Sequence, residues 1–347
     1  LGVVLGGRGV VNNRGVGVPG RDRRGDHVCS ACRHPQRAER FDHGCRISEP
    51  TGHTVFPATA FDAQVQVMRA LHDEGTVPVP EVLWFEADGA VIGAPFFVMA
   101  RSDGEVPPDV MPYTFPDSCW LSHASTADRM RLQCSAVEAL VGIHQVTPEV
   151  HDLDFLVPDQ PGATSLERHL GGWEDYLEWA TADDRSPLLD ECFAWLRANL
   201  PEEGGDTGAP RLSWGDARIG NMMFVDFEVA AVLDWEMASV APPEVDLGWM
   251  VYLHRFFQDI TTDLGADGMA EFMRPVDVVS TYEAASGRRV GDLRWHIAYA
   301  AMRHGVIMRR VTERGVLFGE AERPADADDM IIHRATLSGM LDGTYWQ

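Results

Sequence analysis

The sequence contains no lysine, so all 29 of its basic residues are arginines, and 53 acidic residues outnumber them. The resulting net charge of −24 argues against nucleic acid or an anionic membrane as the main partner, because both repel an acidic surface. A cationic small molecule would be tolerated. The chain also lacks any apolar run long enough to span a bilayer.

The six cysteines form no regularly spaced framework. Since no secretory signal is visible either, the sequence predicts a reduced, cytoplasmic protein. Cys29 and Cys32, flanked by His27 and His34, have the spacing of half a zinc site. No second ligand pair follows at a finger-like distance, so we favour free thiols over a metal site here.

Composition divides the 347 residues into unequal parts. Residues 1–45 are rich in glycine and arginine, and the stretch up to Arg46 carries a charge of +5 against −29 for the remainder. This first segment shows neither strand alternation nor a helical stripe, which is typical of a poorly ordered basic tail or of translation from an altered reading frame. A proline-rich loop after Gly104 marks a second boundary. We therefore expect an N-terminal lobe over 46–103 and a C-terminal lobe over 104–347.

Hydrophobic periodicity predicts an α+β fold with a small antiparallel sheet followed by a larger, mainly helical part. In the first part we expect a helix over 61–71 and two strands over 77–86 and 91–100. The helices expected further on are 127–145, 166–179, 187–200, 245–257, 269–286, 290–314 and 330–341.

Three oxygen-bearing side chains stand in a pattern that suits phosphoryl transfer. Asp216 and Asn221 share one loop, and Asp234 follows the apolar run Val229–Leu233. An Asp-x-x-x-x-Asn loop, followed by a short hairpin that ends in Asp, provides one carboxylate for the attacking hydroxyl and two oxygens for Mg²⁺. The hairpin brings the second carboxylate alongside the loop.

At these residues the sequence resembles the aminoglycoside phosphotransferase and choline-kinase-like family, whose members are relatives of the protein kinases. The family motif H-G-D-x-x-x-x-N reads here as W-G-D-A-R-I-G-N, from Trp214 to Asn221, and L-D-W-E follows at Leu233–Glu236. The phrases P-T-G-H-T-V-F-P and I-G-A-P-F-F-V-M look nearest to the branch related to kinase domains fused to acyl-CoA dehydrogenases. The resemblance implies a two-lobed, protein-kinase-like fold.

The resemblance also implies roles for individual residues. Asp216 would be the catalytic base, and Asn221 and Asp234 would be Mg²⁺ ligands. Asp246 would support the catalytic loop through backbone hydrogen bonds. Trp214 replaces the usual histidine, which we interpret as a packing residue beneath the loop.

Nucleotide binding would involve the N-terminal lobe. Arg46 matches the strand position whose basic residue touches the α- and β-phosphates, although an ordinary solvated strand residue is an equally good interpretation. Gln64 takes the place of the glutamate that normally pairs with that basic residue. The backbone expected to lie against the adenine ring belongs to Phe97, Val98, Met99 and Ala100.

A glycine-rich nucleotide loop has one candidate, Gly6–Gly7, which lies further upstream of Arg46 than the family pattern leads us to expect. We interpret it as irregular chain, so the N-terminal lobe is expected to be incomplete in this feature.

Several polar residues keep two interpretations each. Arg218 either touches substrate or phosphate or pairs with a nearby acid, and Glu236 either reaches a second Mg²⁺ through water or is a structural carboxylate. His144 is expected to be a core histidine satisfied by the backbone. Arg303, Arg309 and Arg310 are expected to face solvent or to bridge to acids.

The function predicted from the resemblance is an ATP- and Mg²⁺-dependent kinase that transfers the γ-phosphate to a hydroxyl of a small molecule. A hydroxylated acyl-CoA or another small metabolite is favoured over an aminoglycoside as the acceptor. Two alternatives belong to other classes, namely a pseudokinase-like binding module and an interaction protein with an acidic surface. The intact set of Asp216, Asn221 and Asp234 favours catalysis over both.

Overall fold

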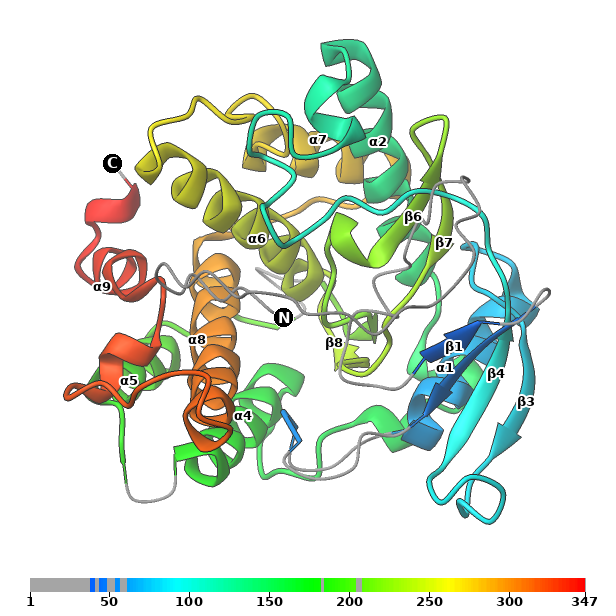
Figure 1. Cartoon of the computed structure of the whole chain (residues 1–347), viewed down its shortest axis with the longest axis horizontal. Coiled ribbons are helices and arrows are strands. Elements are labelled where there is room, and N and C mark those ends of the chain that lie inside the picture. The colour runs from blue at the N-terminus through cyan, green and yellow to red at the C-terminus, as the bar shows by residue number, and fades with distance from the viewer. Residues whose placement is uncertain are drawn as a thin grey trace, which may run out of the picture.

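The computed structural model describes residues 38–40, 44–48, 54–56, 61–181, 184–203 and 208–346. The candidate nucleotide loop at Gly6–Gly7 and the Cys29–Cys32 pair lie outside these residues. The described part forms a small lobe built on an antiparallel sheet and a larger, mainly helical lobe (Figure 1). The predicted α+β, two-lobed fold is confirmed.

The small lobe is a four-stranded antiparallel sheet in the order β1-β2-β4-β3. One helix, α1, accompanies the sheet, and Phe61, Val65, Met68 and Leu71 form its buried face. Phe61 lies with its ring centroid 5.2 Å from that of Phe97, which joins the helix to the middle of the sheet. The bounds are β1 Ala38–Arg40, β2 Gly44–Ser48, α1 Phe61–Glu74, β3 Val82–Glu86 and β4 Phe96–Ala100.

Three boundaries in this lobe differ from the prediction. The sheet begins at Ala38, so the boundary expected between residues 45 and 46 falls inside β2. The strand expected over 77–86 starts only at Val82, because Pro78 and Pro80 lack the backbone N–H that a ladder requires. The strand expected over 91–100 is likewise confined to β4, since turns occupy most of residues 91–95.

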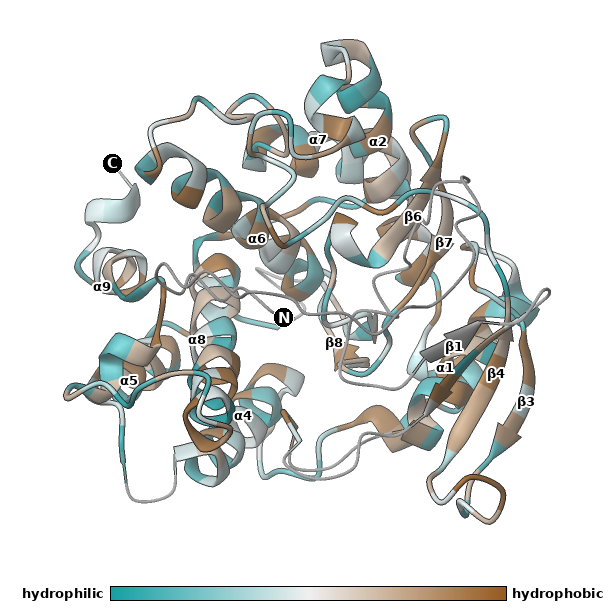
Figure 2. Cartoon of the chain, viewed as in Figure 1, coloured by the Kyte–Doolittle hydropathy of each residue, from teal (hydrophilic) through white to brown (hydrophobic). Residues whose placement is uncertain are grey.

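The large lobe contains helices and two small two-stranded sheets, β5–β8 and β6–β7. The helix expected from residue 269 begins instead at Pro275, a residue whose fixed φ suits the first helical position. Figure 2 shows apolar residues concentrated on β6 and β7, whereas the helices carry both apolar and polar residues. The strands are β5 Arg211–Ser213, β6 Met222–Val225, β7 Glu228–Val232 and β8 Ser239–Ala241. The helices are α2 Thr126–Ile143, α3 Pro148–His151, α4 Ser165–Thr181, α5 Pro187–Ala198, α6 Glu244–Asp263, α7 Pro275–Ser286, α8 Arg294–Leu317 and α9 Arg334–Asp342.

Helices α6 and α8 pack closely together in the middle of the large lobe (Figure 1). Gly248 of α6 lies against the backbone of His296 in α8, where an added Cβ would come within 2.7 Å of the carbonyl carbon. That distance is shorter than a carbon–carbon contact allows, so the absence of a side chain at this position sets the spacing of the two helices.

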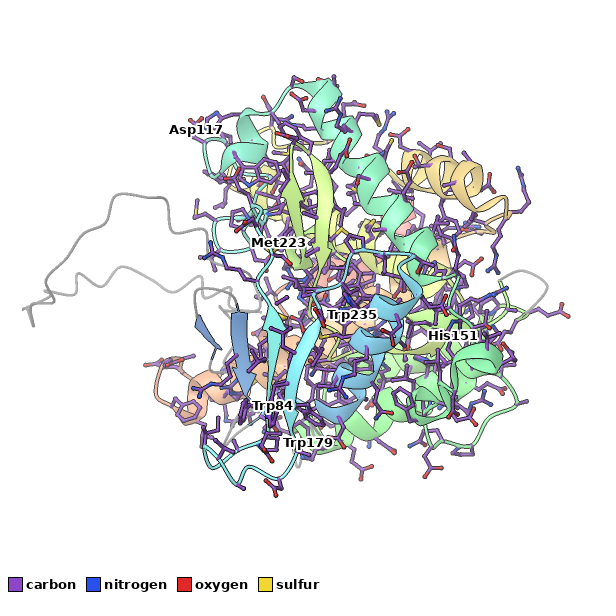
Figure 3. The ribbon with its side chains drawn as sticks, turned by 90° about the vertical axis from the view of Figure 1, so that its right-hand side faces the viewer. Trp84, Asp117, His151, Trp179, Met223 and Trp235 are labelled. Atoms are coloured by element: carbon purple, nitrogen blue, oxygen red, sulfur yellow. The ribbon has the colours of Figure 1, made fainter. Side chains whose placement is uncertain are left out.

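A continuous hydrophobic core joins the two lobes, with Phe97 of the sheet and Trp235 and Trp249 of the large lobe among its members. In the side view of Figure 3, Trp235 lies in the interior and Trp84 on the small lobe, where its side chain is exposed. No helix of the described residues combines the length and apolarity that crossing a membrane requires.

Candidate active site

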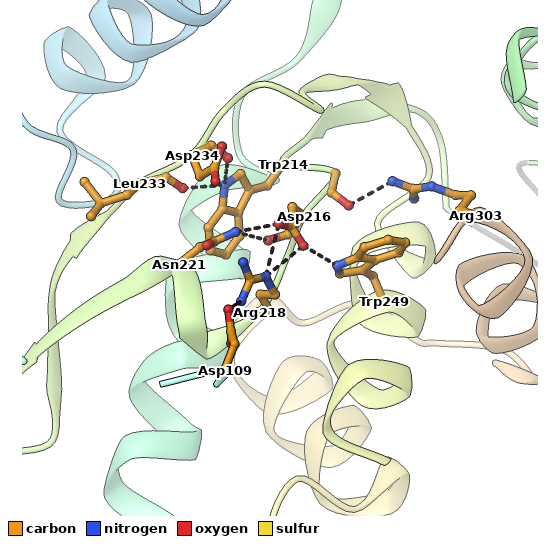
Figure 4. Close-up of polar contacts among 10 residues, drawn as sticks. Asp109, Trp214, Asp216, Arg218, Asn221, Leu233, Asp234, Trp249 and Arg303 are labelled. Atoms are coloured by element: carbon orange, nitrogen blue, oxygen red, sulfur yellow. Dashed lines mark hydrogen bonds and ion pairs between the residues drawn. The ribbon is translucent and has the colours of Figure 1, made fainter. Parts of the chain in front are cut away.

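The β6–β7 hairpin brings the loop 214–221 and the residues after β7 to one place. Met222 pairs with Val232 across the hairpin, and the N–H of Leu233 donates to the carbonyl of Asn221 at 3.0 Å. Asn221 and Asp234 therefore lie at the same end of the hairpin, and Asp216 lies beside them (Figure 4). The three side chains singled out in the sequence are brought together.

Asp216 is 4% exposed and is surrounded by donors. Its Oδ1 accepts from Trp249 Nε1 at 2.7 Å, and its Oδ2 accepts from Asn221 Nδ2 at 2.8 Å. Arg218 Nε lies 3.1 Å from both oxygens. The carboxylate is held in one orientation, as a group that must receive a proton in a defined direction requires.

Asp246, at the beginning of α6, is fully buried beneath the loop. Its Oδ2 accepts from the N–H of Trp214 at 2.7 Å, and its Oδ1 accepts from the N–H of Gly215 at 2.9 Å and from Ser213 Oγ at 2.8 Å. Burial by itself raises the pKa of Asp246, but the hydrogen bond and charge of His144, together with the two N–H groups, lower it below its usual value.

His144 is buried as predicted, but its expected partner was wrong. Instead of the backbone, its Nε2 lies 3.0 Å from Asp246 Oδ2, and its Nδ1 lies 2.9 Å from the hydroxyl of Tyr282. The side chain of His144 thus fixes the carboxylate that supports the loop 214–221.

Trp214 does more than pack. Its indole Nε1 lies 3.0 Å from the carbonyls of both Leu233 and Asp234, so it joins the loop to the end of the hairpin. Asp234 itself has φ of +62°, a left-handed conformation that is uncommon outside glycine and is often found at functional sites. The indole therefore helps to hold Asp234 in a specialised backbone conformation.

Arg303 contradicts the expectation of a solvent-facing side chain, since it is 2% exposed. Its Nη2 donates to the carbonyl of Gly215 at 2.9 Å, and its guanidinium lies 4.4 Å from the centre of the Trp249 ring. Burial lowers the pKa of Arg303 below its usual range. Arg309 is also buried, but it does bridge to an acid, Asp184, at 2.9 Å.

Two functional neighbours of Asp216 were missed in the sequence. Trp249 follows Asp246 by three residues on α6, and such residues share a helix face, so its position beneath the loop could have been inferred. Arg303 lies 88 residues from its partner Gly215, and no local pattern indicates the contact.

Arg218 pairs with nearby acids, which is one of the two roles considered for it. Besides Asp216, its Nη1 contacts Asp109 Oδ2 at 2.6 Å. Glu236 lies half-buried two residues beyond Asp234, immediately after Trp235.

Two residues expected to assist nucleotide binding lie in different elements of the small lobe, Arg46 in the sheet and Gln64 in the helix. Arg46 lies in β2 opposite Val98, half-buried, with its guanidinium 5.8 Å from the centre of the Phe96 ring. Gln64 is buried in the first turn of α1.

The expectation that the backbone of 97–100 lies against an adenine ring needs correction. Phe97, Val98, Met99 and Ala100 belong to β4, which has β2 on one side and β3 on the other. Their backbone groups are engaged in the sheet, and the N–H of Ala100 donates to the carbonyl of Glu81 at 2.8 Å. The first backbone to leave the sheet is that of residues 101–104.

The described residues contain no cluster of three or more His, Cys, Asp or Glu side chains that would hold a metal by itself. Asn221 nevertheless offers an oxygen: its Nδ2 donates to Asp216, whereas its buried Oδ1 has no hydrogen-bond partner within the described part. A buried amide oxygen without a donor fits a hard cation, and Mg²⁺ commonly takes one or two protein oxygens and obtains its remaining ligands from phosphates and water. The pair Asn221 and Asp234 fits that requirement.

A cavity of about 980 Å³ lies elsewhere in the large lobe, lined by Trp195, Trp295 and Trp346 among others. None of the site residues named above contributes to its wall.

Comparison with known proteins agrees with this geometry. A sequence model described as "phosphotransferase enzyme family" matches residues 50–275. The structure is similar to that of a candidate aminoglycoside phosphotransferase from Ralstonia eutropha, with a TM-score of 0.65, 23% identity, and coverage of 90% of this chain and 93% of the other.

Curated relatives carry the names of acyl-CoA dehydrogenases. The chain is 26% identical to the probable acyl-CoA dehydrogenase IBR3 of Arabidopsis thaliana over 78% of its own length and 33% of that protein's. It is 29% identical to acyl-CoA dehydrogenase family member 11 of Rattus norvegicus over 57% of its own length and 24% of the relative's. The chain thus spans a third or less of the relatives it matches.

The fold and the site together define a kinase-like phosphotransferase. The chain belongs to the phosphotransferase enzyme family, since the family model covers more than half of it. The class of reaction that this family carries out is phosphoryl transfer.

Proposed function

We propose that the protein is an ATP- and Mg²⁺-dependent kinase that transfers the γ-phosphoryl group of ATP to a hydroxyl of a small molecule. The observation that carries this proposal is the meeting of Asp216, Asn221 and Asp234 at one end of the β6–β7 hairpin. Loop, hairpin and helix α6 each contribute fixed hydrogen bonds there, so the site is organised before any substrate binds.

Asp216 would act on the acceptor. Its carboxylate orients the hydroxyl and receives its proton while the hydroxyl oxygen bonds to the γ-phosphorus. The bond from that phosphorus to the bridging oxygen of ADP breaks, and ADP leaves with the bonding electrons. Trp249 and Arg218 hold the carboxylate during this step, so most of the acceleration comes from positioning.

Asn221 and Asp234 would hold Mg²⁺ through Asn221 Oδ1 and the Asp234 carboxylate. When bound, the ion neutralises charge on the phosphate oxygens. The Trp214 indole supports this role because its N–H donates to the carbonyls of Leu233 and Asp234 and so fixes the backbone at Asp234. Glu236 would reach a second ion through water.

Nucleotide recognition would involve the small lobe and its exit. Residues 101–104 follow the sheet directly and are the segment we assign to the adenine edge. Arg46 would supply positive charge to the α- and β-phosphates, as a guanidinium in place of the more usual ammonium group. Gln64 would assist Arg46 by a hydrogen bond.

The acceptor class follows from the relatives. Because the curated relatives are named acyl-CoA dehydrogenases and this chain spans only part of them, we propose a hydroxylated acyl group, free or as its CoA thioester. A reaction on an acyl chain would then be shared between a phosphotransferase and a dehydrogenase. An aminoglycoside is the less favoured acceptor.

A panel of hydroxylated compounds tests the proposal. Medium-chain hydroxy fatty acids, their CoA thioesters, choline and kanamycin would each be incubated with Mg-ATP, and ADP release would be measured, with the Asp216→Asn protein as the blank. ADP release stimulated by a hydroxyacyl compound supports the assignment. Binding of Mg-ATP without release for any compound would indicate a binding module instead.

A further inference from the structure

Asp109 is an acid of the segment that connects the two lobes, and it contacts the catalytic loop directly. Its Oδ2 lies 2.6 Å from Nη1 of Arg218, whose Nε lies 3.1 Å from each oxygen of Asp216. One guanidinium therefore joins an acid of the connecting segment to the proposed catalytic base (Figure 4).

This arrangement is enclosed by protein. Arg218 is 4% exposed, and the side chain of Asp109 is 19% exposed. Burial alone disfavours a charged guanidinium, but the charges and hydrogen bonds of Asp109 and Asp216 raise the pKa of Arg218 above its usual value. The cation is stable in this place because two carboxylates share it.

The surrounding backbone holds Asp109 in reach. Glu105 and Phe224 exchange two backbone hydrogen bonds of 2.9 Å, which attach the connecting segment to the β6–β7 hairpin. Gly104 has φ of +147°, and an added Cβ would lie 3.0 Å from the carbonyl oxygen of Phe224. The close approach of the connecting segment to the β6–β7 hairpin thus depends on the glycine at position 104, next to Glu105.

Gly220 completes the arrangement from the side of the loop. A Cβ at this position would lie 2.4 Å from Arg218 Nη1 and 2.7 Å from Asp109 Oδ1. Because Gly220 has no side chain, the loop leaves space for the ion pair between Arg218 and Asp109.

We propose that Asp109 is a positioning residue of the phosphotransfer site, which acts through Arg218 to hold Asp216 toward the acceptor. The inference rests on the proposed function for the role of Asp216, although the mechanical link from Asp109 to the loop does not. Without Asp109, Arg218 keeps one carboxylate partner among the described residues, Asp216, and the two side chains can turn together, so Asp216 loses a fixed direction.

The test compares two isosteric variants of the same segment. Asp109→Asn removes the charge that holds Arg218, whereas Asp117→Asn changes an acid whose side chain is 85% exposed. For Asp109→Asn we expect kcat for ADP release from Mg-ATP to fall about tenfold or more, with the KM for ATP nearly unchanged. Asp117→Asn should behave as the unmodified protein does. Equal kinetics of the two variants would overturn the proposal.

Hydrogen–deuterium exchange of the peptide covering residues 214–221 provides a readout that needs no turnover. Asp109→Asn and Arg218→Gln should each raise its deuterium uptake, and the double variant should show no further increase. Uptake unchanged in Asp109→Asn would refute the link itself. A protein that releases no ADP with any acceptor, but shows this exchange, would refute the proposed function and leave the link standing. Thermal unfolding of each variant confirms that the comparison is made on folded protein.

Discussion

At the scale of single residues, the site depends on donors that surround one carboxylate. Trp249, Asn221 and Arg218 all donate to Asp216, and they reach it from a helix and from two positions of the loop. A carboxylate held by three donors cannot rotate freely, so in the proposed reaction Asp216 would contribute direction as well as basicity.

Replacing Asp216 by Asn should therefore reduce kcat by about 10²- to 10⁴-fold, the range of a lost general base. Binding of Mg-ATP should survive, because we assign the nucleotide and metal contacts to other residues. Calorimetric titration with Mg-ATP beside the turnover assay checks this. Asp226→Asn, a change at the exposed tip of the hairpin, is the matched control. Equal loss of binding and turnover in Asp216→Asn would contradict the division of roles.

Trp214 contributes a hydrogen-bond donor to the site as well as a buried ring. The substitution Trp214→Phe keeps most of the buried ring but leaves the carbonyls of Leu233 and Asp234 without the indole N–H. We expect a loss of about 1–3 kcal/mol in the free energy of unfolding, and a higher Mg²⁺ concentration for half-maximal ADP release. Urea unfolding and a Mg²⁺ titration measure the two effects. An unchanged Mg²⁺ requirement would mean that the indole does not position Asp234.

At the scale of elements, the spacing of α6 and α8 determines where the loop is supported. Helix α6 carries Asp246 and Trp249, and α8 carries Arg303, so both helices hold the loop from below. Gly248 sits at their contact, and a change of helix spacing there would move all three side chains.

Gly248→Ala should destabilise the protein by about 1–3 kcal/mol, because the new methyl group meets the backbone of His296. It should also lower kcat through the displaced loop. Gly315→Ala is a control that should raise stability instead of lowering it. A Cβ at this position of α8 would lie 3.6 Å from Cβ of Ala321, an ordinary contact distance. Alanine also favours a helix over glycine by about 0.5–1 kcal/mol. Urea unfolding compares them. Equal stabilities would show that the α6–α8 contact adjusts without cost.

At the scale of the whole molecule, buried histidines link stability to pH. Burial lowers the pKa of His254 and His296 to about 3 and that of His169 and His333 to about 4. In the unfolded chain these groups titrate near pH 6.5. Between about pH 6.5 and 4 the unfolded state therefore binds more protons, and the free energy of unfolding falls as the pH falls.

Each such histidine should cost about 1.4 kcal/mol per pH unit within this window. His296→Phe keeps an aromatic ring in the core and removes one titrating group. Its stability, measured by urea unfolding at several pH values from 7.5 to 4.5, should fall less steeply than that of the unmodified protein. His123→Gln, a change at an exposed side chain, should leave the slope as it was. Parallel slopes for His296→Phe and the unmodified protein would contradict the assignment.

Sequence reasoning succeeded where a pattern is local. Asp216, Asn221 and Asp234 lie within nineteen residues, and the hairpin between them is itself a short-range structure. It failed for the adenine-facing backbone at 97–100, because whether a strand's backbone is free depends on its neighbours in the sheet. It also failed for Arg303, whose partners Gly215 and Trp249 lie far away in the sequence.

The amino-acid sequence by itself indicated the class of reaction and predicted that Asp216, Asn221 and Asp234 lie together, because spacing along a loop and a hairpin already dictates which side chains meet. It also determined the two-part α+β organisation through its periodicities. Only the tertiary structure decided which donors hold Asp216, that Asp109 reaches it through Arg218, and that Trp214 fixes the end of the hairpin. These contacts join segments separated by up to about a hundred residues, and such pairs are selected by packing of the whole chain and not by any local preference.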